Sequence, residues 1–427
     1  MLFMRPTDSL TIFVQQLGRG LRLCSRTNKE CLTVLDFVGQ YRREFRFADR
    51  LGAMLADPSA SIKSQVESGF TALPPGCSIT LERVAKERVL AHINAQVRGR
   101  REKLIESLKQ LRERLERTPT QLEYIETTRL DPRVFYTGDE RSTWAGILQG
   151  AGLGGAIEEV RVLEPYIAPL RATASLTDRS LVEFGIAMLD VLERGAELSA
   201  EVLQDRRLQV LLVEFGQSVA GVLGLDAHAA AADVVGVLRS NAALRGELRS
   251  LLRAVSSCAR TLSLAPSVPI PQRVPLALHH TYTRKQLFAG FGWEAIWRTT
   301  PQSGVAWIEE HGAYIMLVTL EKDEESFTER TRYRDFAITP TQFHWQSQAT
   351  ARPERGDGMR IVNARNGLGT MWLFVRRARK DDFGTEPYAF MGAFRPTKIE
   401  GMLPMSVTGD LANAMPAEWF EVAARAR

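Results

Sequence analysis

The strongest constraint on the fold is a change of sequence pattern across a proline-rich stretch. Four prolines fall within ten residues: Pro266, Pro269, Pro271 and Pro275. Proline fixes φ and has no backbone N–H to donate, so this spacing predicts an extended linker over residues 266–277. Residues 154–265 are rich in Ala, Leu and Val with few strand signals, and predict a helical bundle. The chain therefore reads as separate helical and β-rich parts.

Residues 278–427 carry the strand signals. Runs that we interpret as alternating strands lie at 313–320, 371–376 and 388–394. Turn-forming residues separate these runs, at Asn366-Gly367 and at 356–358. We expect a mostly β domain of about 150 residues, in line with the usual domain size.

The first 54 residues read as a small α/β unit. Residues 1–4 and 32–37 are short apolar runs of the strand type, and residues 10–21 between them have helical spacing. A unit of this size is small for independent stability. We expect it to pack poorly unless the helical region that follows covers it.

Residues 55–117 predict a loop-rich linker followed by a long amphipathic helical region, with Ser78 as the N-cap. Residues 118–153 predict a small helical module. A helix pair that packs on its neighbours is the favoured interpretation, and a DNA-reading helix-turn-helix is the alternative. The fold class is thus multidomain α and α+β.

Charge and cysteine content limit the class of protein. Lys and Arg number 55 against 50 Asp and Glu in 427 residues, a net charge of +5. This balance permits a nucleic-acid partner without requiring one. No apolar run is long enough to cross a bilayer, so no membrane partner is expected. Four cysteines are too few for a disulfide scaffold, and Cys24 and Cys31 are too far apart for a usual zinc pair. We expect a cytoplasmic protein with no metal site.

The most specific motif is Q-x-x-G-R-x-x-R, formed by Gln15, Gly18, Arg19 and Arg22. The arginines are three residues apart, so they share one helix face. A guanidinium binds phosphate oxygens in pairs and keeps its charge, which suits contact with a transferring phosphoryl group. A basic helix with solvated arginines is the plainer alternative.

This motif and its flanks, 3–9 and 34–39, resemble motif VI at the end of the second RecA-like lobe of superfamily II (DEAD/DEAH-type) helicases. The resemblance implies that Arg19 and Arg22 are catalytic and contact ATP phosphates, and that Gln15 and Gly18 bind nucleotide. It also implies that the chain is the C-terminal portion of a longer or split helicase.

The phosphate-binding half of such an enzyme is missing from the sequence. No G-x-x-x-x-G-K-[ST] motif occurs, and no Asp-Glu pair follows a strand where it would hold Mg²⁺. We therefore expect no ATPase activity from this chain alone. ATP and Mg²⁺ would act only in the full-length protein, or together with an upstream nuclease or helicase half.

From Tyr282 onward the chain resembles a C-terminal domain fused to bacterial superfamily II helicases, some of which are modification-dependent (type IV) restriction enzymes. The matching pieces are spread over the whole region: 282–284, 297–298, 327–328, 333–335, 343–348, 373–376, Gly392, Pro404 and Met405. The resemblance implies a barrel like the PUA and SRA domains that reads double-stranded DNA, with modified cytosine as the candidate base and base flipping as the mechanism.

Six residues suit such a reader: Tyr333, Asp335, Trp345, Gln346, Gln348 and Arg376. Trp345 would stack on a base, while Gln346 and Gln348 would hydrogen-bond to its edge and Arg376 would hold a phosphate. Strand alternation equally allows Trp345 to face the barrel core. The alternative function is a non-catalytic regulatory or interaction subunit that binds a partner helicase or another protein.

Overall fold

The computed structural model describes most of the chain. The described residues are 2–3, 10–21, 31–36, 50–51, 54–55, 65–66, 70, 73, 77–87, 89, 100–128, 130–225, 228–258, 264–321 and 335–426. The chain divides into two compact units, residues 1–104 with 127–131, and residues 105–126 with 132–427. Each unit is described by itself.

The first unit contains a strand–helix–strand arrangement. Strand β1 (Leu2–Phe3) pairs in parallel with β2 (Leu35–Asp36), and helix α1 (Leu10–Leu21) lies between them in the chain. A parallel pair needs a crossover connection, and a helix of this length provides it. The predicted α/β order and the bounds of the helix are confirmed, although the described strands are shorter than predicted.

A small apolar cluster in the same unit lies where the sequence predicted a helix to start, at Ser78. Ile79 and Leu81 pack against a core of Leu51, Leu55, Val66, Phe70 and Val89. Residues 77–82 have no regular secondary structure, and helical residues begin at Arg83. Ser78 is therefore not the N-cap of a helix, because the residues after it are not helical where they meet this cluster.

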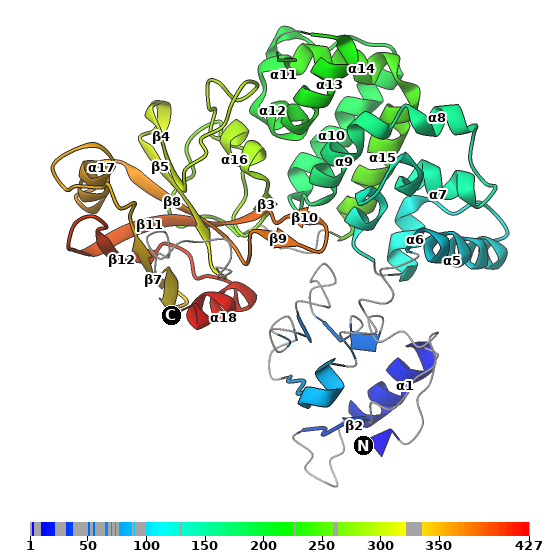
Figure 1. The fold of residues 1–427 in the computed structure, drawn as a ribbon, viewed down its shortest axis with the longest axis horizontal. Helices are drawn as coiled ribbons and strands as arrows, with labels where there is room; N and C mark the ends of the chain where they lie inside the picture. Colours follow the sequence, from blue (N-terminus) through cyan, green and yellow to red (C-terminus); the bar gives the residue numbers. More distant parts are fainter. Residues whose placement is uncertain are drawn as a thin grey trace. The chain divides into compact units, whose positions relative to one another are not determined.

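The second unit opens with helices. They are α5 (Arg100–Leu115), which begins in the first unit, then α6 (Gln121–Thr128), α7 (Trp144–Gly150), α8 (Ile157–Arg161), α9 (Ile167–Ala174), α10 (Arg179–Glu193), α11 (Ala200–Gln204), α12 (Arg206–Leu212), α13 (Gly216–Leu223), α14 (Ala231–Ser240) and α15 (Ala242–Cys258). Short 3-10 turns connect some of them: η1 (Pro132–Tyr136), η2 (Glu140–Ser142), η3 (Glu164–Tyr166) and η4 (Val213–Phe215). Figure 1 shows these helices gathered in one layer, which confirms the predicted helical bundle.

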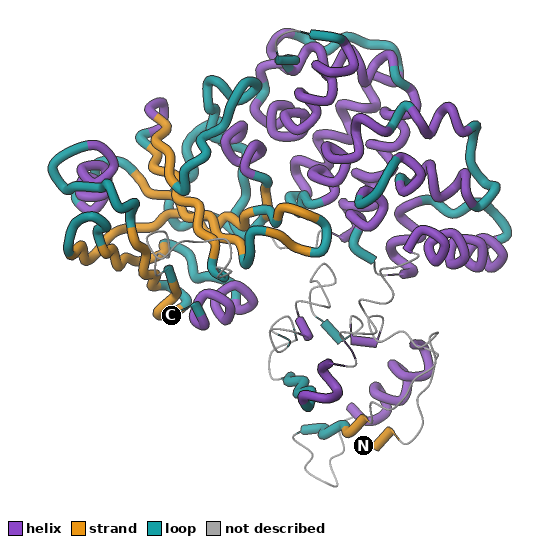
Figure 2. Tube along the Cα trace, in the orientation of Figure 1, coloured by secondary structure: helices purple, strands orange, loops and turns teal. Residues whose placement is uncertain are grey.

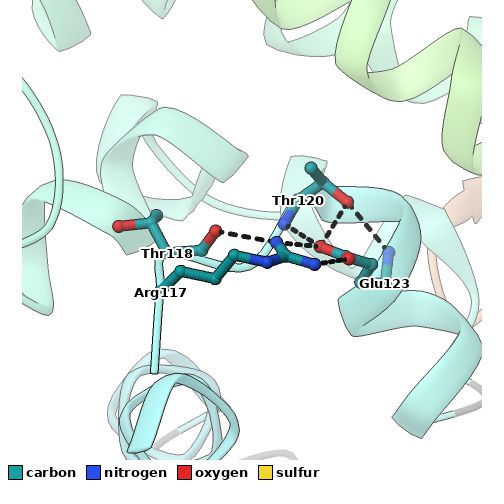
Figure 3. A network of polar contacts seen from close by, with 4 residues as sticks. All are labelled: Arg117, Thr118, Thr120 and Glu123. Carbon is teal, nitrogen blue, oxygen red and sulfur yellow. Dashed lines mark hydrogen bonds and ion pairs between the residues drawn. The ribbon is translucent and has the colours of Figure 1, made fainter. Parts of the chain in front are cut away.

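A capping box starts α6 (Figure 3). The Glu123 carboxylate accepts the backbone N–H of Thr120 at 2.8 Å, and the Glu123 N–H donates to the Thr120 hydroxyl at 3.2 Å. This reciprocal pair satisfies two otherwise unpaired donors at the helix start. Arg117 also binds the Glu123 carboxylate, and this hydrogen bond holds the pKa of Glu123 down at about 2. The exposed ion pair joins the end of α5 to the start of α6.

The module predicted over residues 118–153 packs as part of the helical layer. Trp144, the first residue of α7, is buried against Tyr124 and Phe135, with ring centroids 5.6 and 5.4 Å away. The buried Glu247 of α15 accepts the N–H groups of Trp144 and Ala145 at 2.8 and 3.0 Å. With its first turn held in this way, α7 fits the packing interpretation better than a DNA-reading helix.

The rest of the unit is a mixed sheet with flanking helices. The strands are β3 (Thr281–Tyr282), β4 (Val305–Ile308), β5 (Ala313–Thr319), β6 (Phe336–Thr339), β7 (Gln342–Gln346), β8 (Thr370–Arg376), β9 (Lys380–Asp381), β10 (Gly384–Thr385), β11 (Tyr388–Glu400) and β12 (Ser406–Leu411). The helices are α16 (Arg284–Gly290), α17 (Gly356–Arg365) and α18 (Ala417–Arg425), with the turn η5 (Glu309–His311). Figure 2 shows the strands together beside the helical layer.

The sheet is open. Its order is β4-β5-β8-β11-β12-β7-β6, with β3 on β11 and a separate β9–β10 hairpin, and β5–β8 is the parallel pair along that order. Among the described residues no pairing joins β4 to β6, so the expected closed barrel is not formed. The predicted strands near 313–320, 371–376 and 388–394 are confirmed as β5, β8 and β11. Residues 356–358 begin α17 and do not form the predicted turn.

The predicted alternation is wrong for the central strands. Both of their faces are covered, which explains why their residues are apolar almost throughout. On β8, Leu373 and Val375 face one core, while Trp372 and Phe374 face an aromatic cluster with Phe291. A sheet covered on both sides does not need to close on itself to bury its apolar residues.

The proline-rich segment joins the two layers closely. Residues 264–280 have no regular secondary structure, as predicted, but Val274 and Leu276 are buried. Tyr282 on β3 donates to the Asp178 carboxylate at 2.7 Å, and Trp297 donates to the Gln209 side chain at 2.5 Å. The helical layer and the sheet therefore form one packed body, and the segment is not a free spacer. Among the described residues no helix has the length and apolarity needed to cross a membrane.

Candidate functional site

The motif residues of the first unit lie on the surface of α1. Gln15, Gly18 and Arg19 are exposed, and no atom from elsewhere lies within 4 Å of the position a Gly18 side chain would take. Arg22 lies outside the described residues. The accessible face of α1 is compatible with the predicted nucleotide contact, which remains a prediction.

The residues expected to read a base lie around β7, where most of them are engaged by the fold. Trp345 is 4% exposed and sits in the sheet core, with its ring 6.5 Å from that of Tyr314. Asp335 is buried and accepts the backbone N–H of Gln346 at 3.0 Å. Gln346 and Gln348 are half-buried. Trp345 therefore presents no open stacking face here, and the core interpretation fits it.

Two members of the predicted set do not join that group. Tyr333 lies outside the described residues. Arg376 ends β8, which is separated from β7 by β11 and β12. Three strand spacings correspond to about 14 Å, so Arg376 and Trp345 belong to different places on the sheet.

Arg376 instead lines a cavity of about 370 Å³ between the helical layer and the sheet, which we call the seam cavity. The helical side contributes Arg133 from η1, Arg171 from α9 and Glu214 from η4. The sheet side contributes residues from α16, the end of β8, the β9–β10 hairpin and the start of β11: Thr283, Arg284, Lys285, Arg376, Asp381, Phe383, Thr385, Glu386 and Tyr388. Cavities of this size commonly bind small ligands or ligand fragments.

Three guanidinium groups in the seam cavity have no carboxylate partner among the described residues: Arg171, Arg284 and Arg376. Arg284 donates to the carbonyl oxygens of Pro301 and Ser303 at 2.7 and 3.0 Å. Arg171 makes a long contact of 3.4 Å with a backbone carbonyl. These arginines therefore donate to neutral acceptors, and among the described residues none of the three forms an ion pair.

Arg376 is the most deeply placed of these cations. It is 9% exposed, donates to the Thr319 hydroxyl at 2.9 Å, and lies 4.5 Å from the ring centroid of Tyr388. Burial lowers its pKa, and the nearby cations Arg284 and Arg379 lower it further, while Tyr388 and the Glu386 carboxylate oppose this shift. A buried charge without an ion-pair partner is costly, and a bound anion would reduce that cost.

The carboxylates of the cavity are held differently from one another. Asp381 binds Arg133 at 2.5 Å, and Glu214 lies 3.8 Å from Lys285. Glu386 accepts the Ala378 N–H at 2.7 Å and has no cationic partner within ion-pair distance among the described residues. Glu386 keeps some exposed surface, yet burial of its carboxyl group raises the pKa to about 7.

The β9–β10 hairpin forms one wall of the cavity and is fixed to the helical side. Besides its ion pair with Asp381, the Arg133 guanidinium lies 4.5 Å from the ring centroid of Phe383. Gly384, at φ +131°, lies near Arg171: a Cβ atom at this position would be 3.8 Å from the guanidinium carbon. The position of this wall thus depends on residues about 250 positions apart in the sequence.

Sequence reasoning missed most of this site. Thr283 and Arg284 belong to one of the matching pieces, but no role was assigned to them, and Glu386 carried no signal at all. Arg171 comes from the predicted helical bundle, in which the sequence indicated no functional residue. The described residues contain no group of three His, Cys, Asp or Glu side chains placed to hold a metal.

Comparison with known proteins identifies one region of the chain. Residues 276–421 match a family described as a domain of unknown function, DUF3427. No curated protein matches the chain. The matched range supplies the sheet side of the seam cavity, from Thr283 to Tyr388, and the helical side precedes it. The sheet region is therefore similar to the DUF3427 domain.

Proposed function

We propose that this chain is a DNA-binding C-terminal portion of an ATP-dependent motor protein of the superfamily II helicase type. The seam cavity would receive a phosphate-bearing unit of the DNA. The observation that carries the proposal is the cluster of three guanidinium groups, Arg171, Arg284 and Arg376, which line one cavity and form no ion pair among the described residues. Such a cluster supplies the backbone contacts that dominate DNA affinity.

The cavity dimensions define what part of a DNA molecule would enter. A volume of about 370 Å³ is too small for a duplex but is suited to a single extruded nucleotide or one backbone phosphate. Preference for modified cytosine stays a prediction, since no base-reading contact is assigned by the cavity itself. Restriction of modified DNA would be the role of the larger protein.

ATP hydrolysis is proposed only for a larger assembly. The exposed Gln15, Gly18 and Arg19 on α1 support a nucleotide contact across an interface with another lobe. This chain has no Walker A sequence, so ATP and Mg²⁺ would be held mainly by the other part of the motor.

DNA binding can be tested by titrating a labelled duplex with the full chain over a series of salt concentrations. We expect Arg376→Gln and Arg284→Gln each to weaken binding about tenfold and to reduce the salt slope by about one. Arg179→Gln is the matched control, because Arg179 is an exposed arginine paired with Glu183 on α10. Thermal midpoints of all variants establish that they are folded.

Two results would contradict the proposal. Absence of binding by the folded wild-type chain at about 50 mM salt would remove the DNA function. Equal losses in all three variants would show that binding is not located at the seam cavity. A duplex with 5-methylcytosine, compared with the unmodified duplex, tests base preference separately.

A regulatory or interaction subunit is the second candidate. It is favoured by the exposed apolar side chains of Val14 and Leu21 on α1 and of Leu35 on β2. Exposed apolar residues on one small unit are typical of a surface that binds another protein. Folded chain that binds no DNA would support this candidate.

A further inference from the structure

Glu386 differs from the other carboxylates of the seam cavity. Asp381 is neutralised by Arg133 at 2.5 Å, while Glu214 has Lys285 at 3.8 Å and also accepts the Thr283 hydroxyl at 2.5 Å. Glu386 has only the Ala378 N–H, at 2.7 Å, and no ion-pair partner among the described residues. It is therefore an acid in a site whose unpaired cations point to an anionic ligand.

The chemistry of the ligand decides which form of Glu386 is compatible with binding. A phosphodiester carries one negative charge and no proton, so it offers acceptors only. An ionised carboxylate beside it would repel it and could donate no hydrogen bond. A neutral carboxyl group can donate its O–H to a phosphate oxygen, in a strong charge-assisted hydrogen bond.

We propose that protonation of Glu386 controls binding at the seam cavity. The cavity binds a phosphodiester when Glu386 is in its neutral carboxylic acid form. Binding of DNA then takes up one proton for each Glu386 that is ionised before binding. This inference rests on the proposed DNA function and names the ionic form of the site that performs it.

The charges around Glu386 place its protonation in the neutral pH range. Burial raises its pKa to about 7, and the nearby Asp381 carboxylate raises it as well. The Ala378 N–H and the charges of Arg377 and Arg133 oppose this shift. The ionised Glu386 carboxylate also raises the pKa of Arg376, so these two charges attract each other. The remaining charged groups that line the cavity are Arg171, Glu214, Arg284 and Lys285.

The expected effect of pH follows from the neutral fraction of Glu386. An acid with a pKa of about 7 is roughly 90% neutral one unit below that value and roughly 10% neutral one unit above it. When only the neutral form binds, apparent affinity scales with this fraction. Wild-type affinity should then fall about tenfold between pH values near 6 and near 8.

The test compares wild type with Glu386→Gln, in which an uncharged amide replaces the carboxyl group at nearly the same size. Affinity for a labelled duplex is measured near pH 6 and near pH 8 at constant ionic strength. We expect Glu386→Gln to lose the pH dependence, and to bind about tenfold more tightly than wild type near pH 8 but equally near pH 6. Glu354→Gln is the matched control, because Glu354 is exposed and does not line the cavity.

Proton uptake gives an independent measurement. Calorimetric titration near pH 7 in two buffers of different ionisation enthalpy reports the protons bound with DNA. Wild type and Glu354→Gln should take up a fraction of a proton that Glu386→Gln does not, and loss of this difference would overturn the inference.

The outcomes separate the two proposals. If Glu386→Gln binds more tightly than wild type by the same factor at both pH values, Glu386 is ionised throughout and the inference is wrong, while DNA binding stands. Weaker binding by folded Glu386→Gln at both pH values also overturns it. If wild type binds no DNA at either pH, the proposed function itself fails.

Discussion

Replacement of Trp345 by alanine distinguishes a core residue from a base-stacking residue. Trp345 is 4% exposed on β7, within the apolar core between the sheet and the helices α17 and α18. Its register partner on β12 is Val407, which is fully buried in the same core. The structure therefore predicts a large loss of stability and no direct effect on DNA affinity.

The size of the loss follows from the volume removed. Truncation of a buried tryptophan to alanine costs about 3–5 kcal/mol, because contacts are lost and a cavity remains. In a body of this size each kcal/mol lowers the thermal midpoint by about 2–4 °C, so we expect a decrease of roughly 10 °C. Trp345→Phe keeps most of the apolar contact and should lose less than half as much stability.

Calorimetry and DNA titration together provide the assay. DNA affinity is measured well below the thermal midpoint of each variant, so that only folded protein contributes. Trp345→Ala should retain wild-type affinity, whereas Arg376→Gln should retain stability and lose affinity. A Trp345→Ala chain with an unchanged midpoint and about tenfold weaker binding would refute the core assignment and restore the stacking role.

Substitutions at three further positions, Glu247, Gly392 and His280, test the packing of the second unit. Glu247→Ala leaves two backbone N–H groups of α7 and the Tyr136 hydroxyl without their acceptor. We expect urea titration to show a free energy of unfolding that is lower by about 3 kcal/mol. Glu247→Gln should lower the free energy of unfolding less. Gly392→Ala should lower the free energy of unfolding by about 1–3 kcal/mol, because Gly392 has φ +91° and a Cβ atom would lie 2.8 Å from the Leu278 side chain. An unchanged urea midpoint would contradict this expectation. Burial lowers the pKa of His280 below 6.5, so the unfolded chain binds the proton first as pH falls. Stability should decrease below pH 6.5 by up to about 1.4 kcal/mol per pH unit for this group, and His280→Gln should reduce that slope.

Local pattern was a reliable guide where side-chain periodicity is strong. The helix over 10–21 follows from the spacing of its apolar residues, and the strands β5, β8 and β11 follow from short apolar runs. The same reasoning was wrong for Ser78 and for residues 356–358, because capping and turn residues are used in more than one local structure. It also left Trp345 undecided, since alternation defines two faces of a strand but not which face becomes covered.

The seam cavity was decided by tertiary structure alone. Arg171, Arg284, Arg376 and Glu386 come from a helix in one layer and from three separate segments of the other. The sequence determined that the chain would contain a helical layer, a β-rich layer and a basic motif helix, because these depend on neighbouring residues. Which charges remain unpaired depends on how the two layers pack, and that packing brings together groups that no local pattern relates.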